Sequence, residues 1–377
     1  MTREELFKTG MDIVYLSACA VNEKVPDADR IAAMDLSLLY ETADRQMLTG
    51  ITAMALQSAG VMDAAFMQAA GKAIHKIAAF DLERAVILDR FEKEGIWYMP
   101  LKGAVIKDLY PKLGMRQMSD NDILVNASRM EDVQQIMQSL GYEAELTPRG
   151  AHDAYFKEPF YNFEIHRRLF SVVNEKLAGY YADVKKRLLP DAGTSCGRHF
   201  SDEDFYIYLT AHEYKHYSNS GTGIRSLLDV YVLWLKKGET LDWTYIYTEL
   251  DKLGLKTFEE ENRRLAMSLF EGRPLSEDDS SMFEYMLSGG TYGNMNNRVE
   301  NKLKGYTESL GGRFRYVFKR IFPSGKHLRY LYPVVDRHPI LLPFAFFYRL
   351  FKGIKKNHKL IGKEIKGLTR KRQSKEK

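Results

Sequence analysis

Residues 95 to 167 alternate between strand-forming and helix-forming segments, and this order limits the folds open to the chain more than any other feature. The segment 122–125 begins with Asp122 and continues with three apolar residues, which is typical of a strand buried on both sides. Strands are also expected at 96–99, 142–146, 154–156 and 161–167, with helices at 101–110 and 128–140. The order strand, helix, strand, helix and then strands predicts a small mixed sheet with helices on one face.

The sequence on both sides of this segment favours helices. Residues 1–90 are rich in Ala, Leu and Met, with apolar residues three or four positions apart. A chain of 377 residues exceeds the usual single hydrophobic core, so several packed units are expected. We therefore predict a mixed α+β protein of the α/β type. Its expected regions are a helical N-terminal region at 1–90, the sheet-containing core at 91–200, a helical domain at 201–310 and a basic aromatic tail at 311–377.

Cysteine content and the N-terminus indicate a cytoplasmic protein. Cys19 and Cys196 are too few for a disulfide framework or a cysteine-rich metal site, which suits a reducing compartment. The first ten residues lack the basic-then-apolar order of a signal peptide. No uninterrupted apolar run reaches the roughly 18 residues that a membrane span requires.

The C-terminal tail carries most of the positive charge. Residues 313–377 contain 19 Lys or Arg and 3 Asp or Glu, a net of +16, so the rest of the chain carries −11 of the total of +5. Within this tail, an apolar and aromatic segment at 338–351 precedes a Lys-rich end. One interpretation is that 338–377 lies on an anionic membrane surface, which would place the protein at the inner face of the membrane. The other is a helix docked on the core, followed by a solubilising tail. Nucleic acid is a weaker expectation because the rest of the chain is acidic.

Three acidic residues in the core segment indicate metal chemistry. Asp120 and Asp122 lie two residues apart at the start of a predicted strand, so both carboxylates should point to one side. Like charges this close repel unless a cation lies between them, and oxygen ligands suit Mg²⁺. Glu164 lies in a later predicted strand between large apolar neighbours, where an acid is costly unless it faces a metal or a cleft. The alternative is a turn, because Ser119 to Asp122 is also good turn chemistry.

The motifs of this segment occur in a recognisable order. A Gly-containing turn comes first, then an acidic pair in a strand, then a third acidic residue on a later strand. The residues are Leu101-Lys102-Gly103, Leu109-Tyr110-Pro111, Gly114-Met115-Arg116, Ser119 to Val125, and Phe163-Glu164-Ile165-His166. In this pattern the chain resembles the uncharacterised nucleotidyltransferase family of the polymerase-β-like nucleotidyltransferase superfamily. The resemblance implies a nucleotidyltransferase-like core in the region 91–200.

The resemblance also implies a reaction and its residues. Asp120, Asp122 and Glu164 would be catalytic and would hold two Mg²⁺ (or Mn²⁺) ions. The ions would grip a nucleoside triphosphate, with ATP the expected donor, while the hydroxyl of an unknown small-molecule or protein acceptor attacks the α-phosphate. The implied nucleotide-binding residues are Lys102, Gly103, Arg116 and Ser119. Gly103 would let the backbone approach the phosphates closely, and Lys102 and Arg116 would stabilise the negative charge that develops during transfer.

One position departs from the superfamily pattern. The turn usually contains Gly-Ser, whereas this chain has Gly103-Ala104 and therefore no hydroxyl to bind phosphate. One interpretation is that Lys102 replaces that contact. This departure leaves a second interpretation open: a catalytically inactive nucleotide-binding or scaffold protein at the membrane surface.

A rival motif lies downstream of the core. His212-Glu213-Tyr214-Lys215-His216 fits H-E-x-x-H, which on a helix places two imidazoles on one face as zinc ligands, with Glu as base. A zinc metalloprotease is therefore a remote alternative, weakened because no third ligand follows at a familiar spacing.

The same region has another interpretation within the resembled family. There, a histidine precedes a Gly-containing loop and an Arg-x-x-x-Asp helix, represented here by His216, 221–223, Arg225 and Asp229. Arg225 and Asp229 are four residues apart and should pair on one helical face. Together with His166, the resemblance suggests His216 and Arg225 as residues of the acceptor cleft.

Overall fold

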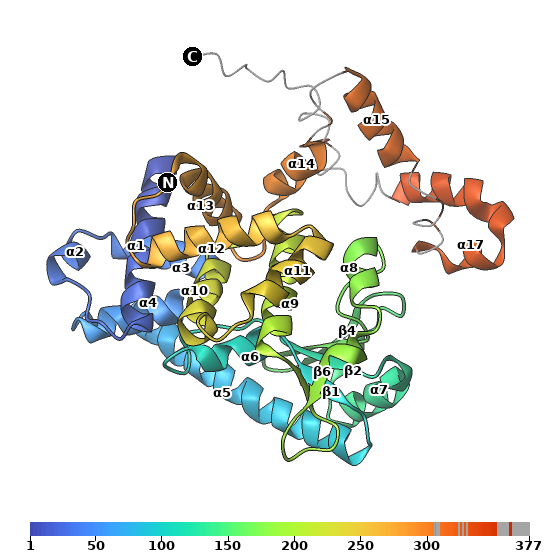
Figure 1. The fold of residues 1–377 in the computed structure, drawn as a ribbon, viewed down its shortest axis with the longest axis horizontal. Coiled ribbons are helices and arrows are strands. Elements are labelled where there is room, and N and C mark those ends of the chain that lie inside the picture. Colours follow the sequence, from blue (N-terminus) through green and yellow to red (C-terminus); the bar gives the residue numbers. More distant parts are fainter. Residues whose placement is uncertain are drawn as a thin grey trace. The chain divides into compact units, whose positions relative to one another are not determined.

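The computed structural model describes residues 1–304, 306, 310–322, 325, 328, 331–352 and 362–363 (Figure 1). The chain divides into two compact units. The larger unit comprises 1–215 and 222–291, and the C-terminal unit comprises 216–221 and 292–377. The fold class of the chain is the predicted one, a mixed α+β fold in which helical regions flank a small mixed sheet.

The first ninety residues are helical, as predicted. Their N-termini carry the capping side chains that such helices need: Thr2 forms a capping box with Glu5, and Asp27, Asp35 and Asp63 accept from backbone amides of the first turn. The helices are α1 (Arg3–Val21), α2 (Ala28–Ala32), α3 (Leu36–Arg45), α4 (Thr49–Ser58) and the long α5 (Ala64–Lys93).

A five-stranded mixed sheet follows, with the strand order β1-β2-β5-β4-β3. β2 and β5 are parallel neighbours, and the other pairs are antiparallel. All five predicted strands are present, with ends shifted by no more than two residues: β1 (Tyr98–Pro100), β2 (Asn121–Val125), β3 (Glu143–Glu145), β4 (His152–Lys157) and β5 (Tyr161–His166). Between them lie α6 (Gly103–Ile106), η1 (Lys107–Leu109), η2 (Ala127–Arg129) and α7 (Met130–Ser139).

Helices cover both faces of this sheet, so the prediction of helices on one face was wrong. On one face, Ile123 and Val125 pack with residues of α5 and α7, including Phe91 and Met137. On the other, Leu124 packs with residues of α9 (Asp202–Tyr217). The alternation follows from strand geometry, because successive side chains point to opposite faces and every residue of β2 is buried.

Further helices complete the larger unit around the second face. They include α12, which contacts both α1 and α10. The elements are α8 (Glu175–Tyr180), η3 (Val184–Arg187), the hairpin β6 (Leu188–Pro190) and β7 (Arg198–Phe200), α10 (Arg225–Lys237), α11 (Trp243–Leu253), α12 (Lys256–Phe270) and α13 (Glu277–Gly289).

The regular elements that the structure describes in the C-terminal unit are helices. The unit contains α14 (Met295–Leu303), α15 (Leu310–Ile321), α17 (Pro333–Arg337), η4 (Pro339–Leu341) and a helix at 342–352. Val299, Leu303 and Tyr316 form a small core. Most of the Lys-rich end of the predicted tail, 353–361 and 364–377, lies outside the described residues. Among the described helices, none has the length and apolar character needed to cross a bilayer.

Candidate active site

Strand register gathers the candidate residues on the face of the sheet that α9 covers. The parallel pairing of β2 with β5 places Asp122 beside Glu164 and Leu124 beside His166. The antiparallel pairing of β5 with β4 places His152 beside His166. Because side chains two residues apart share a face, these four polar residues lie on the same side as Leu124.

Asp122 is the most enclosed acid of the site. Its side chain is 4% exposed, and Lys102 Nζ donates a hydrogen bond to Oδ1 over 2.6 Å. His166 Nε2 lies 2.8 Å from the same oxygen. Burial alone raises the pKa of Asp122, but the Lys102 ammonium and the His166 ring outweigh it and hold that pKa well below its ordinary value. Asp122 is therefore an anion whose charge is already shared by two neighbours.

Asp120 precedes β2 and behaves in the opposite way. Its Oδ1 accepts a hydrogen bond from Ser119 Oγ (3.1 Å). Burial raises the pKa of Asp120, and the negative charges of Asp122 and Glu164 raise it further. The structure thus brings the three predicted acids close enough for their charges to interact.

Lys102 and Gly103 occupy the turn between β1 and α6. Lys102 has a φ of +50°, a conformation that costs a non-glycine residue about 1–3 kcal/mol. Burial lowers its pKa, but the Asp122 carboxylate outweighs burial and raises it above the ordinary value. Gly103 matters for a different reason: a Cβ there would lie 3.3 Å from Met118 and 3.4 Å from Arg116. Lys102 therefore carries the unusual backbone geometry, and Gly103 carries the close packing.

Arg116 is buried in an ion pair with Asp229, and its charge also interacts with that of Asp120. Its Nε and Nη2 donate to the Asp229 carboxylate of α10 over 2.9 and 2.8 Å. Tyr110 donates to the same carboxylate (2.7 Å). The sequence had indicated a pair between Arg225 and Asp229, but Arg225 instead donates to the carbonyl of Gln117 (3.2 Å). Burial and the nearby Arg116 charge lower the pKa of Arg225 to about 10.

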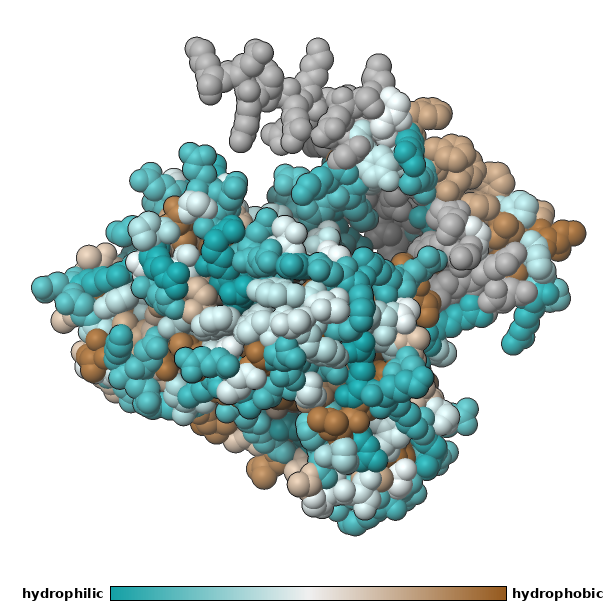
Figure 2. All heavy atoms as spheres, in the orientation of Figure 1, coloured by the Kyte–Doolittle hydropathy of each residue, from teal (hydrophilic) through white to brown (hydrophobic). Residues whose placement is uncertain are grey.

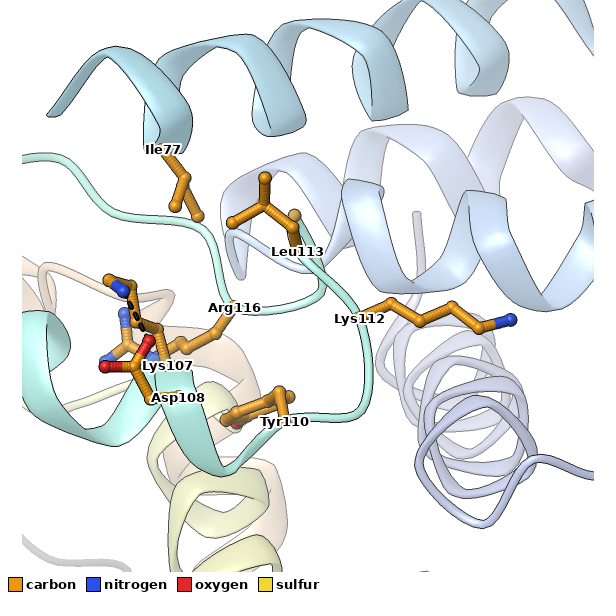
Figure 3. Close-up of a pocket in the computed structure, with 8 residues that line it drawn as sticks. Ile77, Lys107, Asp108, Tyr110, Lys112, Leu113 and Arg116 are labelled. Atoms are coloured by element: carbon orange, nitrogen blue, oxygen red, sulfur yellow. Dashed lines mark hydrogen bonds and ion pairs between the residues drawn. The ribbon is translucent and has the colours of Figure 1, made fainter. Parts of the chain in front are cut away.

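Arg116 also lines a small cavity (Figure 3). The cavity measures about 180 Å³, below the roughly 300–1,000 Å³ of small-molecule sites, so it is too small for a nucleoside triphosphate. Lys112 extends away from the other labelled side chains (Figure 3). The lining residues are Ile77, Lys107, Asp108, Tyr110, Lys112, Leu113, Gly114 and Arg116.

The sequence analysis missed two residues of α9 that face the site. The charge of Lys215 interacts with Lys102, Asp122 and Glu164, and burial lowers its pKa to about 8. Tyr208 interacts with Lys102 and the same acids, and its hydroxyl is buried without a hydrogen-bond partner among the described residues. Their signal was hidden because α9 was interpreted through its H-E-x-x-H motif alone.

The structure gives the glutamate of that motif a buried position. Asn262 Nδ2 donates to Glu213 Oε2 (3.0 Å), and burial raises the pKa of Glu213 to about 7. His212 belongs to the larger unit and His216 to the C-terminal unit. Within the described residues, neither histidine belongs to a group of three or more side chains placed to hold a metal ion.

Comparison with known proteins gives one finding. A family model described as uncharacterised nucleotidyltransferase matches residues 32–271, which include the whole sheet, the three acids and α9. No curated protein and no solved structure matches the chain.

Proposed function

Because the chain belongs to the uncharacterised nucleotidyltransferase family over 32–271, we propose that it is a metal-dependent enzyme that transfers a nucleoside monophosphate. The donor is a nucleoside triphosphate, with ATP expected, and the acceptor is a hydroxyl on a small molecule or a protein. The observation that carries the proposal is the register of β2 and β5, which places Asp122 beside Glu164. Asp120 directly precedes β2, so all three acids lie near this pair of strands.

The three acids fit a divalent-metal site. Asp120 lies in the field of two other carboxylates, which raise its pKa, so a cation between them would relieve the repulsion. Carboxylate oxygens are the ligands that Mg²⁺ and Mn²⁺ prefer. When bound, such ions neutralise the triphosphate and stabilise the entering and leaving oxygens.

The surrounding residues bind and orient the substrates. The acceptor oxygen forms a bond to the α-phosphorus while the bond to the oxygen bridging the α- and β-phosphates breaks, so pyrophosphate leaves and the hydroxyl proton passes to a carboxylate. Lys102 and Lys215 supply positive charge for the phosphates, and Ser119 orients Asp120. Arg116 acts through its ion pair with Asp229, which anchors the loop before β2 to α10.

The remaining proposed roles are for the acceptor. His166 lies against Asp122 and Arg225 against the Gln117 carbonyl, so both are tied to the segment that carries the acids. We propose these two as the acceptor side of the site.

Labelled nucleotides test the proposal. Full-length protein, each α-labelled nucleoside triphosphate, Mg²⁺ or Mn²⁺ and cell extract should give a labelled product that chelator abolishes. Asp122→Asn keeps the shape of the side chain but removes its charge, and should lower the transfer by at least about a hundredfold. The control Asp89→Asn changes an exposed acid of α5 and should transfer at the wild-type rate.

The inactive alternative also has an observation in its favour. Lys102 already supplies positive charge to Asp122 at 2.6 Å, as a metal ion would. Ala104 lacks the usual hydroxyl. Under this alternative the protein binds nucleotide without turning it over. Nucleotide binding with no labelled product in any extract would favour it over the enzyme.

We also propose that the C-terminal unit contacts an anionic membrane surface. Phe344, Phe347 and Phe351 are 70%, 64% and 73% exposed. Their spacing of three and four residues places them on one face of the helix at 342–352. Hydrophobic side chains of the C-terminal unit are visible on the molecular surface (Figure 2). Residues 352–377 add 11 Lys or Arg against 2 Glu, so apolar and ionic attraction act together. The attachment is peripheral, at the cytoplasmic face.

Vesicle sedimentation tests this contact. Full-length protein should pellet with vesicles rich in phosphatidylserine at low salt and be released near 0.5 M salt, where the screening length falls to a few ångströms. The triple variant Phe344→Ser, Phe347→Ser and Phe351→Ser should no longer pellet with the vesicles. A control with Leu82→Ser, which removes a single exposed apolar side chain from α5, should still pellet. Equal recovery of all proteins in the supernatant would contradict the contact.

A further inference from the structure

Glu164 lies between two imidazole rings at distances that are too long for hydrogen bonds. Its Oε2 is 3.6 Å from His152 Nδ1 and 3.5 Å from His166 Nε2. Hydrogen bonds to such nitrogens are normally about 2.7–3.2 Å long. Two donor atoms each about 2.1 Å from a common ion at the tetrahedral angle are roughly 3.4 Å apart. The spacing therefore matches the separation of ligands around one ion.

Strand pairing holds these three side chains in place. His166 and Glu164 lie two residues apart on β5, and His152 is the cross-strand partner of His166 on β4, with ring centroids 4.8 Å apart. His166 is buried, whereas His152 and Glu164 are partly exposed. One side of the group is thus fixed in the protein and the other is open, so a bound ion could keep a free position for water or substrate.

We propose that His152, Glu164 and His166, whose ligand atoms lie within 4.8 Å of one another, bind one divalent transition-metal ion. Two imidazoles select Zn²⁺ or Co²⁺ over Mg²⁺, because nitrogen ligands suit these ions better than Mg²⁺. Asp122 Oδ1 is 2.8 Å from His166 Nε2, so an ion bound at that nitrogen takes the place of this contact. Glu164 is shared with the proposed function, and the inference deepens that function by naming the ion that this side of the site takes.

Among the residues that the structure describes, the other histidines do not offer the same arrangement. Within the described residues, this is the one group of three or more His, Cys, Asp or Glu side chains whose ligand atoms lie within 4.8 Å of one another. His199 pairs with the single carboxylate of Asp191 (2.6 Å) and is half exposed. It therefore provides a matched control: an imidazole beside a carboxylate without a second imidazole.

Ion binding is measured on untagged full-length protein without nucleotide. Calorimetric titration with Zn²⁺, and the visible absorption of Co²⁺, should show one ion per chain. Loss of a ligand should weaken binding by at least about ten- to a hundredfold in His152→Ala, since even outer-shell partners contribute that much. His152 is partly exposed, so this variant should fold, which circular dichroism checks. His199→Ala should bind as the wild type does, and a tenfold excess of Mg²⁺ should not displace Co²⁺.

The outcomes separate this inference from the proposed function. Zn²⁺ binding that depends on His152, without nucleotidyl transfer, would support the ion site and count against the enzyme. Transfer with Mg²⁺, together with Zn²⁺ binding that is absent or unchanged in His152→Ala, would overturn the ion site and leave the enzyme standing. Displacement of Co²⁺ by equimolar Mg²⁺ would also overturn it, because the site would then be a site of oxygen ligands alone.

Discussion

The buried Glu213 of α9 should make the larger unit less stable as the pH rises. Its carboxyl accepts from Asn262 Nδ2 (3.0 Å), and this hydrogen bond offsets only part of the cost of burial. Burial raises its pKa from 4.5 to about 7. In the unfolded chain the same carboxyl loses its proton near its ordinary value, so the folded state binds more protons across the window between the two pKa values.

The magnitude follows from that difference in pKa. Below about pH 4.5 the carboxyl is protonated in both states, and the effect is absent. Between about pH 4.5 and 7 the free energy of unfolding falls as the pH rises, and above about pH 7 the loss is complete. Each unit of pKa is worth about 1.4 kcal/mol, so the total loss is about 3 kcal/mol. Glu213→Gln removes the ionisation, so this loss should disappear.

Tryptophan fluorescence isolates the relevant unit. All three tryptophans, Trp97, Trp234 and Trp243, belong to the larger unit. Urea unfolding is followed at pH 5, 6, 7 and 8 for the wild type and Glu213→Gln. The variant should gain about 2.5 kcal/mol on the wild type between pH 5 and pH 8, because part of the loss has already occurred at pH 5.

An exposed glutamate supplies the control. Glu239→Gln changes a solvent-exposed carboxyl after α10, and its stability should run parallel to that of the wild type. Parallel pH curves for the wild type and Glu213→Gln would refute the reasoning, because the carboxyl would then be ionised at little cost in the folded state. That result would also revive Glu213 as an anionic base of the H-E-x-x-H motif.

Two further predictions concern Arg116 and the H-E-x-x-H motif. Arg116→Met leaves the Asp229 carboxylate buried without its cation, so it should lower the free energy of unfolding by about 3–5 kcal/mol in the urea assay. The control Arg273→Met removes a surface ion pair and should lower it by less than about 1 kcal/mol. A small effect of Arg116→Met would show that the ion pair is solvated in solution. His212 and His216 should hold no structural zinc, so the zinc content of untagged protein should be unchanged by His216→Ala; stoichiometric zinc lost in that variant would restore the protease interpretation.

The local pattern of the sequence predicts the strands well. Apolar runs bounded by Gly, Pro and Asn place β2 and β5 within one residue of their observed ends. Once β2 and β5 are paired in parallel, Asp122 and Glu164 are expected to lie next to each other. Periodicity carries this information because it is set by neighbours in the sequence.

Long-range partners were the part that the sequence could not supply. Arg116 and Asp229 are separated by more than a hundred residues, so helical spacing favoured the nearer Arg225 instead. The histidine on β4 carries no motif of its own and joins Glu164 only through the pairing of β4 with β5. Lys215 was obscured in a similar way, because its role depends on α9 covering the sheet. In each case the deciding contact comes from packing rather than from local spacing.

The position of the label in the transferred group tests the central claim most directly. Parallel reactions contain ATP labelled at the α-phosphate or at the γ-phosphate, with Mg²⁺, cell extract, and either wild-type protein or Asp122→Asn. Nucleotidyl transfer predicts that the α-label enters the acceptor and the γ-label leaves in pyrophosphate, with both signals lost in the variant. Entry of the γ-label into the acceptor, or α-label transfer that Asp122→Asn leaves unchanged, would contradict the account.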